Sequence, residues 1–501
     1  MQTTTPAFDA NAVADIRKIS WSVRASFDKT LNAGSNFFQL DVSQLDGPDL
    51  LQGSGSTIAE WDKYSYTDYS DRVMSVEWSR VEDEPFSVTT AIATITLNNT
   101  DDFFTPGVGS AIDGNILPRR PFKISAGFNN STIPVFVGLN ERMPIIDNQA
   151  KTATFHCVDF LSSILNRDID QTQIFIDQRI DQIIESLLQD QGLVAGQYSL
   201  DVGRVKVPFA AFDKGTKLGN AIRSLAQADI AYVFMDELGI IQFKNYAYRT
   251  SVPVATFDTS NTLEWSNNGD SDLINVVEVK ADVREVQPLQ PVWQSVEQVS
   301  IQPGSSVQIW ADFLDPVTSV QTPTAGLSST NSYYVADGTL TVSGTAFSNS
   351  YRMTFTNPGS STATITDLEV WATPATVTNT LRERYEDTTS TAKYDEQVLE
   401  VSNPYIQTES NARSIATLIL DSYAEYKDTL KLVVKGNPAL QIGDAVTVSV
   451  GTVSDDYVIT AIDNRYSDGG YTQIIKVKNI VFRDYFKLGV SQLDGTHVLG
   501  F

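Results

Sequence analysis

Few side chains in this sequence could carry out nucleophilic chemistry. The chain has two histidines, His156 and His497, and one cysteine, Cys157. A cysteine beside a histidine could act as a nucleophile with its base, but residues 154–158 alternate like a β-strand. Since neighbouring residues of a strand point to opposite faces, we interpret His156 and Cys157 as structural residues. One cysteine also excludes an internal disulfide framework.

Carboxylates are abundant, with 61 aspartates and glutamates. Calcium could draw oxygen ligands from Asp270, Asp272 and Asp282, or from Asp455 and Asp456, but no EF-hand spacing is present. We interpret these residues as turn-forming acids. A glycosidase needs two carboxylates roughly 5 to 9.5 Å apart. With so many acids any pair can be chosen, so the sequence leaves that hypothesis unconstrained.

Three tryptophans, Trp293, Trp310 and Trp371, could stack on sugar rings, although most large aromatics belong to cores. The sequence contains neither a G-x-x-x-x-G-K-[ST] phosphate loop nor a G-x-S-x-G nucleophile elbow. We therefore expect no catalytic, cofactor-binding or metal-binding residues, and a protein that is not an enzyme.

Composition limits the partners of the chain. Its 501 residues, 42% hydrophobic and 19% charged, favour two to four folded domains. The formal charge of -25 disfavours sequence-specific nucleic-acid binding, because phosphates would be repelled. No apolar run approaches the roughly 20 residues of a membrane span, and residues 1–5 do not resemble a secretion signal. We expect synthesis and assembly in a cytosol.

Hydrophobic periodicity predicts the elements. Residues 19–158 alternate with a period of two, which is typical of antiparallel sheet. Apolar residues at helical spacing predict helices over 176–188 and 218–226. Residues 231–235 and 240–244 flank the turn sequence of residues 236–239 and predict a hairpin.

The second half of the chain begins with a strand-like segment at 272–280. Lysine is then absent until Lys393 while Ser, Thr, Pro and Gly become frequent, which indicates an inserted β-sandwich of about 85 residues. A capped amphipathic helix is expected after Thr408. Four strands follow, at 429–434, 445–450, 457–462 and 471–477.

These patterns predict a mainly β chain with α+β parts. The expected division is an N-terminal arm (1–17), a first β-barrel domain (18–167, completed by 251–285), a small α+β domain (168–250), an inserted β-sandwich (286–375), a second β-barrel domain with one helix (376–485) and a C-terminal tail (486–501). The tail repeats the motif of residues 38–53, since Val-Ser-Gln-Leu-Asp-Gly occurs at both 42–47 and 490–495. The repeat could mark equivalent docking segments or a duplicated structural hairpin.

Three segments carry a resemblance to a known family: residues 101–107 with 117–124, 272–277 and 432–446. By these segments and their order the chain resembles tail hub proteins, also called minor tail proteins, of long-tailed bacteriophages, and the baseplate hub of contractile tails. The insertion, which ends with residues 363–374, is also similar to insertions in such proteins. The resemblance spans about residues 18 to 485.

The resemblance implies two barrels of the tail-tube type in each chain and a homotrimer at the distal tail tip of a virion, assembled in bacterial cytoplasm. Three chains would present six barrels and adapt a sixfold tube to a threefold tip. Implied partners are the distal tail or tail tube protein, the tape measure protein and tip or fibre proteins, with genomic DNA only passing through the channel. No cofactor is implied. The second barrel lacks the Phe-Thr-Pro-Gly segment of residues 104–107, so the barrels need not be equivalent.

Two other functions remain open. The chain could be a carbohydrate-binding adhesin or a wall-degrading tail lysin that contacts host-surface glycan through the inserted sandwich. A cytosolic hydrolase is disfavoured by the scarcity of histidine and of nucleophile motifs. For a hub, we expect part of the acidic excess to line the bore and repel DNA.

Overall fold

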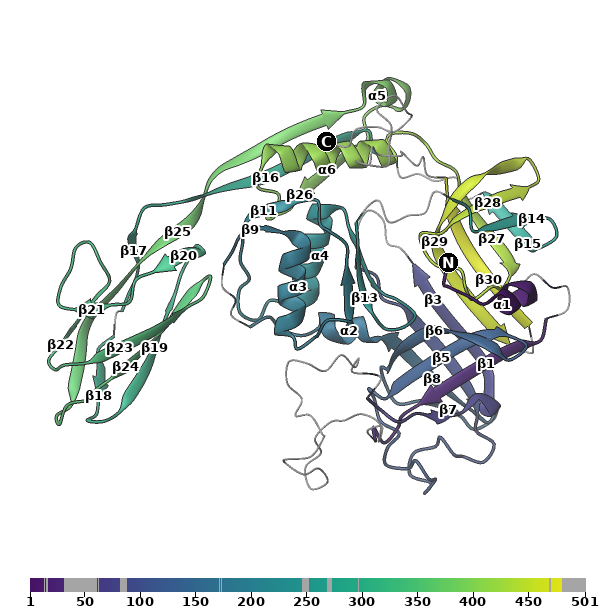
Figure 1. Ribbon diagram of the computed structural model, residues 1–501, viewed down its shortest axis with the longest axis horizontal. Coiled ribbons are helices and arrows are strands. Elements are labelled where there is room, and N and C mark those ends of the chain that lie inside the picture. The colour runs from purple at the N-terminus through teal and green to yellow at the C-terminus, as the bar shows by residue number, and fades with distance from the viewer. Residues whose placement is uncertain are drawn as a thin grey trace.

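Two β-rich units, an α+β unit and an outlying arm make up the chain (Figure 1). The computed structural model describes residues 1–12, 14, 17–30, 61, 63–81, 88–170, 172, 174–245, 252–267, 273–295, 297–467 and 470–479. Both copies of the Val-Ser-Gln-Leu-Asp-Gly repeat lie outside these residues. None of the described helices is long and apolar enough to cross a membrane.

The first barrel is a curled sheet with the strand order β3-β4-β8-β6-β5-β1-β2, preceded by the short helix α1 (Pro6–Ala12). Its apolar core is rich in phenylalanine, including Phe27, Phe122 and Phe155. The strands alternate between buried and wet residues, as the sequence predicts. Their bounds are β1 Ile19–Ala25, β2 Thr67–Asp68, β3 Val73–Val81, β4 Ile92–Asn98, β5 Pro121–Phe128, β6 Ser131–Asn140, β7 Ile145–Asp147 and β8 Thr152–Asp159, with the 3-10 turn η1 at Ser70–Arg72.

The second barrel combines strands from two distant parts of the chain. Strand β14 pairs with β28 and β15 pairs with β27, and Phe257 of β14 lies in the core of this barrel. The expectation that residues 251–285 complete the first barrel is therefore wrong, because β14 and β15 pair with later strands and the apolar residues of β16 (Val276–Val286) belong to the core of the α+β unit. The bounds are β14 Ala255–Asp258, β15 Thr262–Asn267, β27 Thr429–Lys435, β28 Ala445–Val450, β29 Val453–Ser467 and β30 Gly470–Lys478.

The α+β unit has one large core that reaches well beyond residues 168–250. Helix α6 was expected in the second barrel, but Ile415 and Ile419 pack in the same cluster as Ile184 of α3 and Val279 of β16. Thr408 caps α6 by accepting a hydrogen bond from the Asn411 N–H at 3.2 Å, as expected. The bounds are α2 Phe160–Leu165, β9 Phe175–Arg179, α3 Ile180–Asp190, β10 Tyr198–Leu200, β11 Lys206–Ala210, α4 Leu218–Asp229, β12 Tyr232–Met235, β13 Ile241–Lys244, β16 Val276–Val286, α5 Thr388–Tyr394, β26 Val398–Ser402 and α6 Glu409–Tyr423.

The helix predicted over 176–188 begins later, at Ile180. Residues 175–179 instead form β9, which pairs with β11, and Asp177 has a positive φ of 53° that no α-helix accommodates. The predicted hairpin is confirmed, since β12 and β13 pair antiparallel.

The arm is a β-sandwich between β16 and the end of β25 (Ala363–Glu386), and it has a core of its own. Strand β25 pairs with arm strands through its first half and with β16 through its second half. It therefore leads from the arm into the α+β unit (Figure 1). The remaining bounds are β17 Gln290–Gln294, β18 Val299–Ile301, β19 Ser306–Asp312, β20 Val317–Val320, β21 Thr324–Ala325, β22 Tyr333–Ala336, β23 Thr341–Ala346 and β24 Ser350–Thr356.

Candidate functional site

The histidine and cysteine singled out by the sequence do not form a catalytic pair. Cys157 is buried in the first barrel, and burial raises the pKa of its thiol, so the nucleophilic thiolate is disfavoured. His156 points to the opposite, wetter face, where its Nδ1 lies 3.4 Å from the Thr94 hydroxyl. The two side chains thus lie on opposite faces of the strand, as its alternation predicts. His497 lies outside the described residues.

The acidic candidates make local contacts. Asp282 accepts a hydrogen bond from the Thr380 hydroxyl at 2.9 Å, and Asp456 accepts one from the Thr447 hydroxyl at 2.7 Å. Asp455 accepts one from the Asn479 amide at 2.7 Å. Across the described parts of the chain, no three His, Cys, Asp or Glu residues are grouped so as to hold a metal ion. Asp270 and Asp272 lie outside those parts.

The three tryptophans of the arm differ in their surroundings. Trp293 is half-buried against the arm core. Trp371 is also half-buried, and its Nε1 donates to Glu369 Oε1 at 2.6 Å. Trp310 has 38% of its surface exposed. Of the three, only Trp310 stands on an exposed face.

The main structural feature is the joint between the two barrels. The second half of β29 pairs antiparallel with β3, from Ala461 opposite Val81 to Ser467 opposite Ser75. This pairing merges the barrels into one 14-stranded sheet. Trp78 and Asn464 are opposite each other and both buried, so the two cores lie on the same side of the shared sheet. The barrels therefore cannot rotate about the joint without breaking a β-ladder.

Aromatic side chains reinforce this joint. Trp21 of β1 lies 5.4 Å from Trp78, 4.7 Å from Tyr466 and 5.6 Å from Tyr471, measured between ring centroids. The Tyr471 hydroxyl donates to Asn464 Oδ1 at 2.8 Å. Each barrel contributes two of the four rings, which bury aromatic surface across the joint and add edge-to-face contacts.

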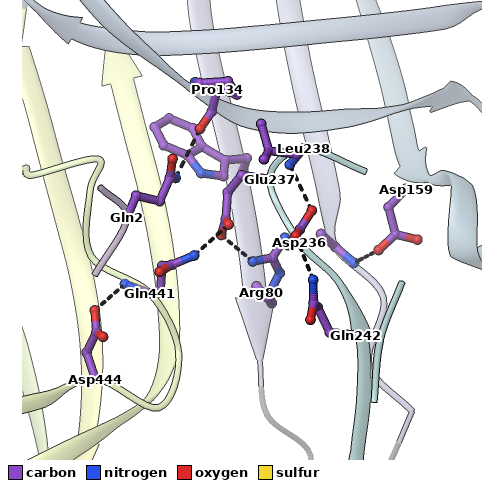
Figure 2. A network of polar contacts seen from close by, with 12 residues as sticks. Gln2, Arg80, Pro134, Asp159, Asp236, Glu237, Leu238, Gln242, Gln441 and Asp444 are labelled. Atoms are coloured by element: carbon purple, nitrogen blue, oxygen red, sulfur yellow. Dashed lines mark hydrogen bonds and ion pairs between the residues drawn. The ribbon is translucent and has the colours of Figure 1, made fainter. Parts of the chain in front are cut away.

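A polar junction connects the same barrels to the α+β unit (Figure 2). Arg80 of β3 donates from Nη1 to Glu237 Oε1 at 2.5 Å, and both side chains are nearly buried, with 13% and 10% exposed. Gln441 of the second barrel donates to the other oxygen, Glu237 Oε2, at 2.7 Å. The Glu237 carboxylate thus joins the first barrel, the second barrel and the α+β unit. Its charge is neutralised by Arg80, as a nearly buried carboxylate requires.

The turn that carries Glu237 is held by hydrogen bonds to Asp236 and by close packing against Trp61. Asp236 accepts hydrogen bonds from the Leu238 N–H at 2.9 Å and from the Gln242 amide at 2.8 Å (Figure 2). It also accepts one from the Ile240 N–H at 2.8 Å. Gly239 has a φ of +84°, and a Cβ there would lie 2.6 Å from the ring of Trp61. Only glycine fits this position.

Burial also perturbs the carboxyl groups around the junction. Asp159 is fully buried at the end of β8, where desolvation raises its pKa to about 6 although it accepts hydrogen bonds from the Ala91 and Ser162 N–H groups. Desolvation likewise raises the pKa of Asp444, which accepts from the Gln441 N–H at 2.8 Å and from the Met1 ammonium. These groups act as local structural acceptors.

The opposite, wet side of the shared sheet is continuous across both barrels. We call it the common face: the outward residues of β27, β30, β29, β3, β4 and β8. At the joint it holds a groove of about 300 Å³ lined in part by Ser79, Ile92 and Ile474. Its exposed or half-exposed charged side chains are three acidic and four basic ones: Glu77, Asp456, Asp463, Lys431, Lys435, Arg465 and Lys476.

Sequence patterns did not identify the junction residues. The alternation of β3 did contain a signal that Arg80 is buried, because Arg80 lies on the same face of the strand as the buried residues Val76 and Trp78. A buried arginine needs an acidic partner. The partner, Glu237, is 157 residues away, and no local pattern identifies it.

No protein-family model and no curated relative matches the chain. Among solved structures it is similar to the 43 kDa tail protein of prophage MuSo2 from Shewanella oneidensis, with a TM-score of 0.48, 12% identity, and coverage of 82% of this chain and 95% of that one. It is also similar to a tail protein from Neisseria meningitidis MC58, with a TM-score of 0.49, 9% identity, and coverage of 92% of this chain and 96% of that one. For prophage tail protein gp18 from Listeria monocytogenes EGD-e, the TM-score is 0.43 and the identity 11%, with coverage of 84% of this chain and 93% of that one. Phage tail proteins are thus among the solved structures similar to the chain.

Proposed function

We propose that this chain is a structural hub of a phage tail tip, and not an enzyme. The observation that carries the proposal is the rigid pair of barrels, merged by β29 and β3 into one sheet. An aromatic cluster and a buried ion pair fix the pair further. A protein that must hold two tube-wall segments at a constant angle needs such a joint, whereas a hydrolase does not. The order of the sequence motifs that resemble tail hub proteins supports the same function.

In this proposal three copies close into a ring of six barrels. A cyclic trimer with two similar units per chain offers six binding positions on one side and three on the other. It could therefore connect a sixfold tail tube, or the distal tail protein, to a threefold tip or fibre. The tape measure protein would end in its channel, and the particle would assemble in the bacterial cytoplasm.

The common face is the candidate wall of the channel, because it is continuous across both barrels. Its charges are mixed, and Arg465 is paired with Glu77 at 3.1 Å. The acidic lining expected from the composition is therefore not part of this proposal. A wall whose acidic and basic side chains nearly balance would hold phosphate weakly, which suits DNA that only passes through.

The test is the mass and shape of the purified full-length chain. Native mass spectrometry and light scattering should give three times the chain mass, and electron microscopy should show rings with six barrel-sized densities. A monomer at every concentration up to about 100 μM, well above typical dissociation constants of stable oligomers, would overturn the proposal.

A further inference from the structure

The arm carries an exposed aromatic side chain that the hub function does not use. Trp310 stands on the outer face of the three-stranded sheet β19-β24-β23, with 38% of its surface exposed. Large aromatic rings usually bury most of their surface. The neighbouring residues Ile309 and Ala311 point into the arm, so this side chain is outside the core by strand parity.

The indole ring is nevertheless held in place. The Phe347 ring lies nearly parallel to it, at 5.9 Å and 22°, and the Arg352 guanidinium lies 5.7 Å from its centroid. Both contacts come from the β23–β24 hairpin. Strand β19 is the edge strand of its sheet, and none of the described strands pairs with it on the other side. The ring is therefore held by the hairpin, while 38% of the Trp310 surface stays exposed at the edge of the sheet.

Polar side chains surround this ring in a regular array. Cross-strand register places Trp310, Arg352 and Thr345 in one row and Gln308, Thr354 and Ser343 in the next. Arg352 has one weak side-chain hydrogen bond, to Thr345 Oγ1 at 3.4 Å. Among the described residues, Gln308, Thr354 and Ser343 have no side-chain hydrogen bond to protein atoms. Their donors and acceptors are available to a ligand.

The charge of the arm limits the ligand class. Between residues 285 and 381, Arg352 is the only lysine or arginine, while residues 286–375 contain six acidic residues. A polyanion would be repelled by this excess. An uncharged ligand with one apolar face and several hydroxyls would stack that face on the indole ring. Its hydroxyls would exchange hydrogen bonds with Gln308, Thr354 and Ser343.

From this arrangement we propose that the outer face of β19-β24-β23 binds a neutral carbohydrate, with Trp310 as the stacking platform and Gln308 and Arg352 as hydrogen-bonding residues. The site is additional to the hub function and does not depend on it. Trp371 and Trp293 do not contribute, since the first donates its N–H to Glu369 and the second packs on the core.

Titration calorimetry on the full-length chain tests the proposal. The probes are hexasaccharides of β-1,4-linked glucose and of N-acetylglucosamine, with hexagalacturonate as the anionic comparison. At least one neutral probe should bind with a Kd of about 1 mM or tighter, and Trp310→Ala should weaken it about tenfold. Gln308→Ala, which leaves the Phe347 contact intact, should weaken binding about threefold, the loss expected for one hydrogen bond.

The matched control is Leu327→Ala, because Leu327 is an apolar arm residue that is 76% exposed and lies outside the array. Its affinity should match that of the unmodified chain. The proposal is overturned if neither neutral probe binds at about 10 mM, a concentration that detects even weak sites. It is also overturned if both array variants bind like the unmodified chain, if Leu327→Ala loses as much affinity as they do, or if hexagalacturonate binds more tightly than both neutral probes.

Discussion

Two buried carboxyl groups, Glu237 and Asp229, show how much single residues contribute to this fold. Arg80 and Glu237 neutralise each other, and the Gln441 amide satisfies the second carboxylate oxygen. Asp229, at the end of α4, has no such partner for one of its oxygens. Its Oδ1 accepts hydrogen bonds from the Arg204 and Val205 N–H groups at 2.8 and 2.6 Å, whereas Oδ2 is buried without a partner in the structure.

Arg80→Met should destabilise the protein by about 3 kcal/mol, because it leaves the Glu237 charge buried beside an amide alone. Urea denaturation measures the loss. The matched control is Arg465→Met, which breaks the exposed Arg465–Glu77 pair, with 60% and 50% of these side chains exposed; its cost should stay below about 1 kcal/mol. Equal losses in the two variants would contradict the assigned importance of the junction.

Asp229→Asn should stabilise the protein at alkaline pH. Desolvation raises the pKa of Asp229 from 3.8 to about 7, and the nearby Asp181 adds to the rise while Arg204 opposes it. Since the folded chain holds a proton that the unfolded chain has lost, stability falls as the pH rises from about 4 to 7 and is constant above that window. An asparagine keeps the acceptor for both N–H groups and carries no charge.

The measurement is the melting temperature of both proteins at pH 5 and pH 8. The variant should gain about 2 to 4 kcal/mol at pH 8, and most of this gain should vanish at pH 5. Asp456→Asn, on an exposed strand position, serves as the control. An equal gain at both pH values would show that the proton on Asp229 is not the cause.

At the scale of elements, sequence predicted what is local and missed what is distant. The β12–β13 hairpin was predictable because Asp236 and Gly239 build its turn within a few residues. The start of α3 was misplaced because Ile176 continues the helical spacing, although the left-handed Asp177 and pairing with β11 make it part of a strand. Apolar spacing alone does not separate these cases.

Pairing between distant strands had no local signal. The joint brings Trp78 and Asn464 together across 386 residues, and β14 and β15 pair with strands that begin 190 and 167 residues later. Each strand could be recognised by its alternation, but alternation is the same for every possible partner. The candidate site depends on this pairing, so its residues could not be chosen from the sequence.

For the whole molecule, the structure separates a rigid body from an arm. Two polar contacts from the β23–β24 turn reach the α+β unit, from the Ser348 N–H to the Thr172 carbonyl at 2.7 Å and from Asn349 to Asp213. Otherwise the arm has its own core. Val286 and Ala375 face each other in the ladder at its base, so a two-residue turn can join them.

Replacing residues 287–374 by Asn-Gly should leave the remaining chain folded, with an unchanged oligomeric state and a melting temperature within about 4 °C of the original, the shift expected for roughly 1 kcal/mol. Light scattering and circular dichroism measure both. The same variant should lose the carbohydrate binding proposed for Trp310. Aggregation, or a change in the number of subunits, would show that the arm is needed for the hub.

Strand β25 has a mechanical consequence. Its 24 residues extend over about 80 Å at the rise of a β-strand. If an attached surface pulls the arm outward, β16 and β25 are loaded together, because both lead into the arm at the same end of their ladder. The force then passes to the parallel ladder between β16 and β26, whose hydrogen bonds share it instead of opening one by one. Strand β25 would then transmit a pulling force on the arm directly to the α+β unit, where helix α6 packs against it.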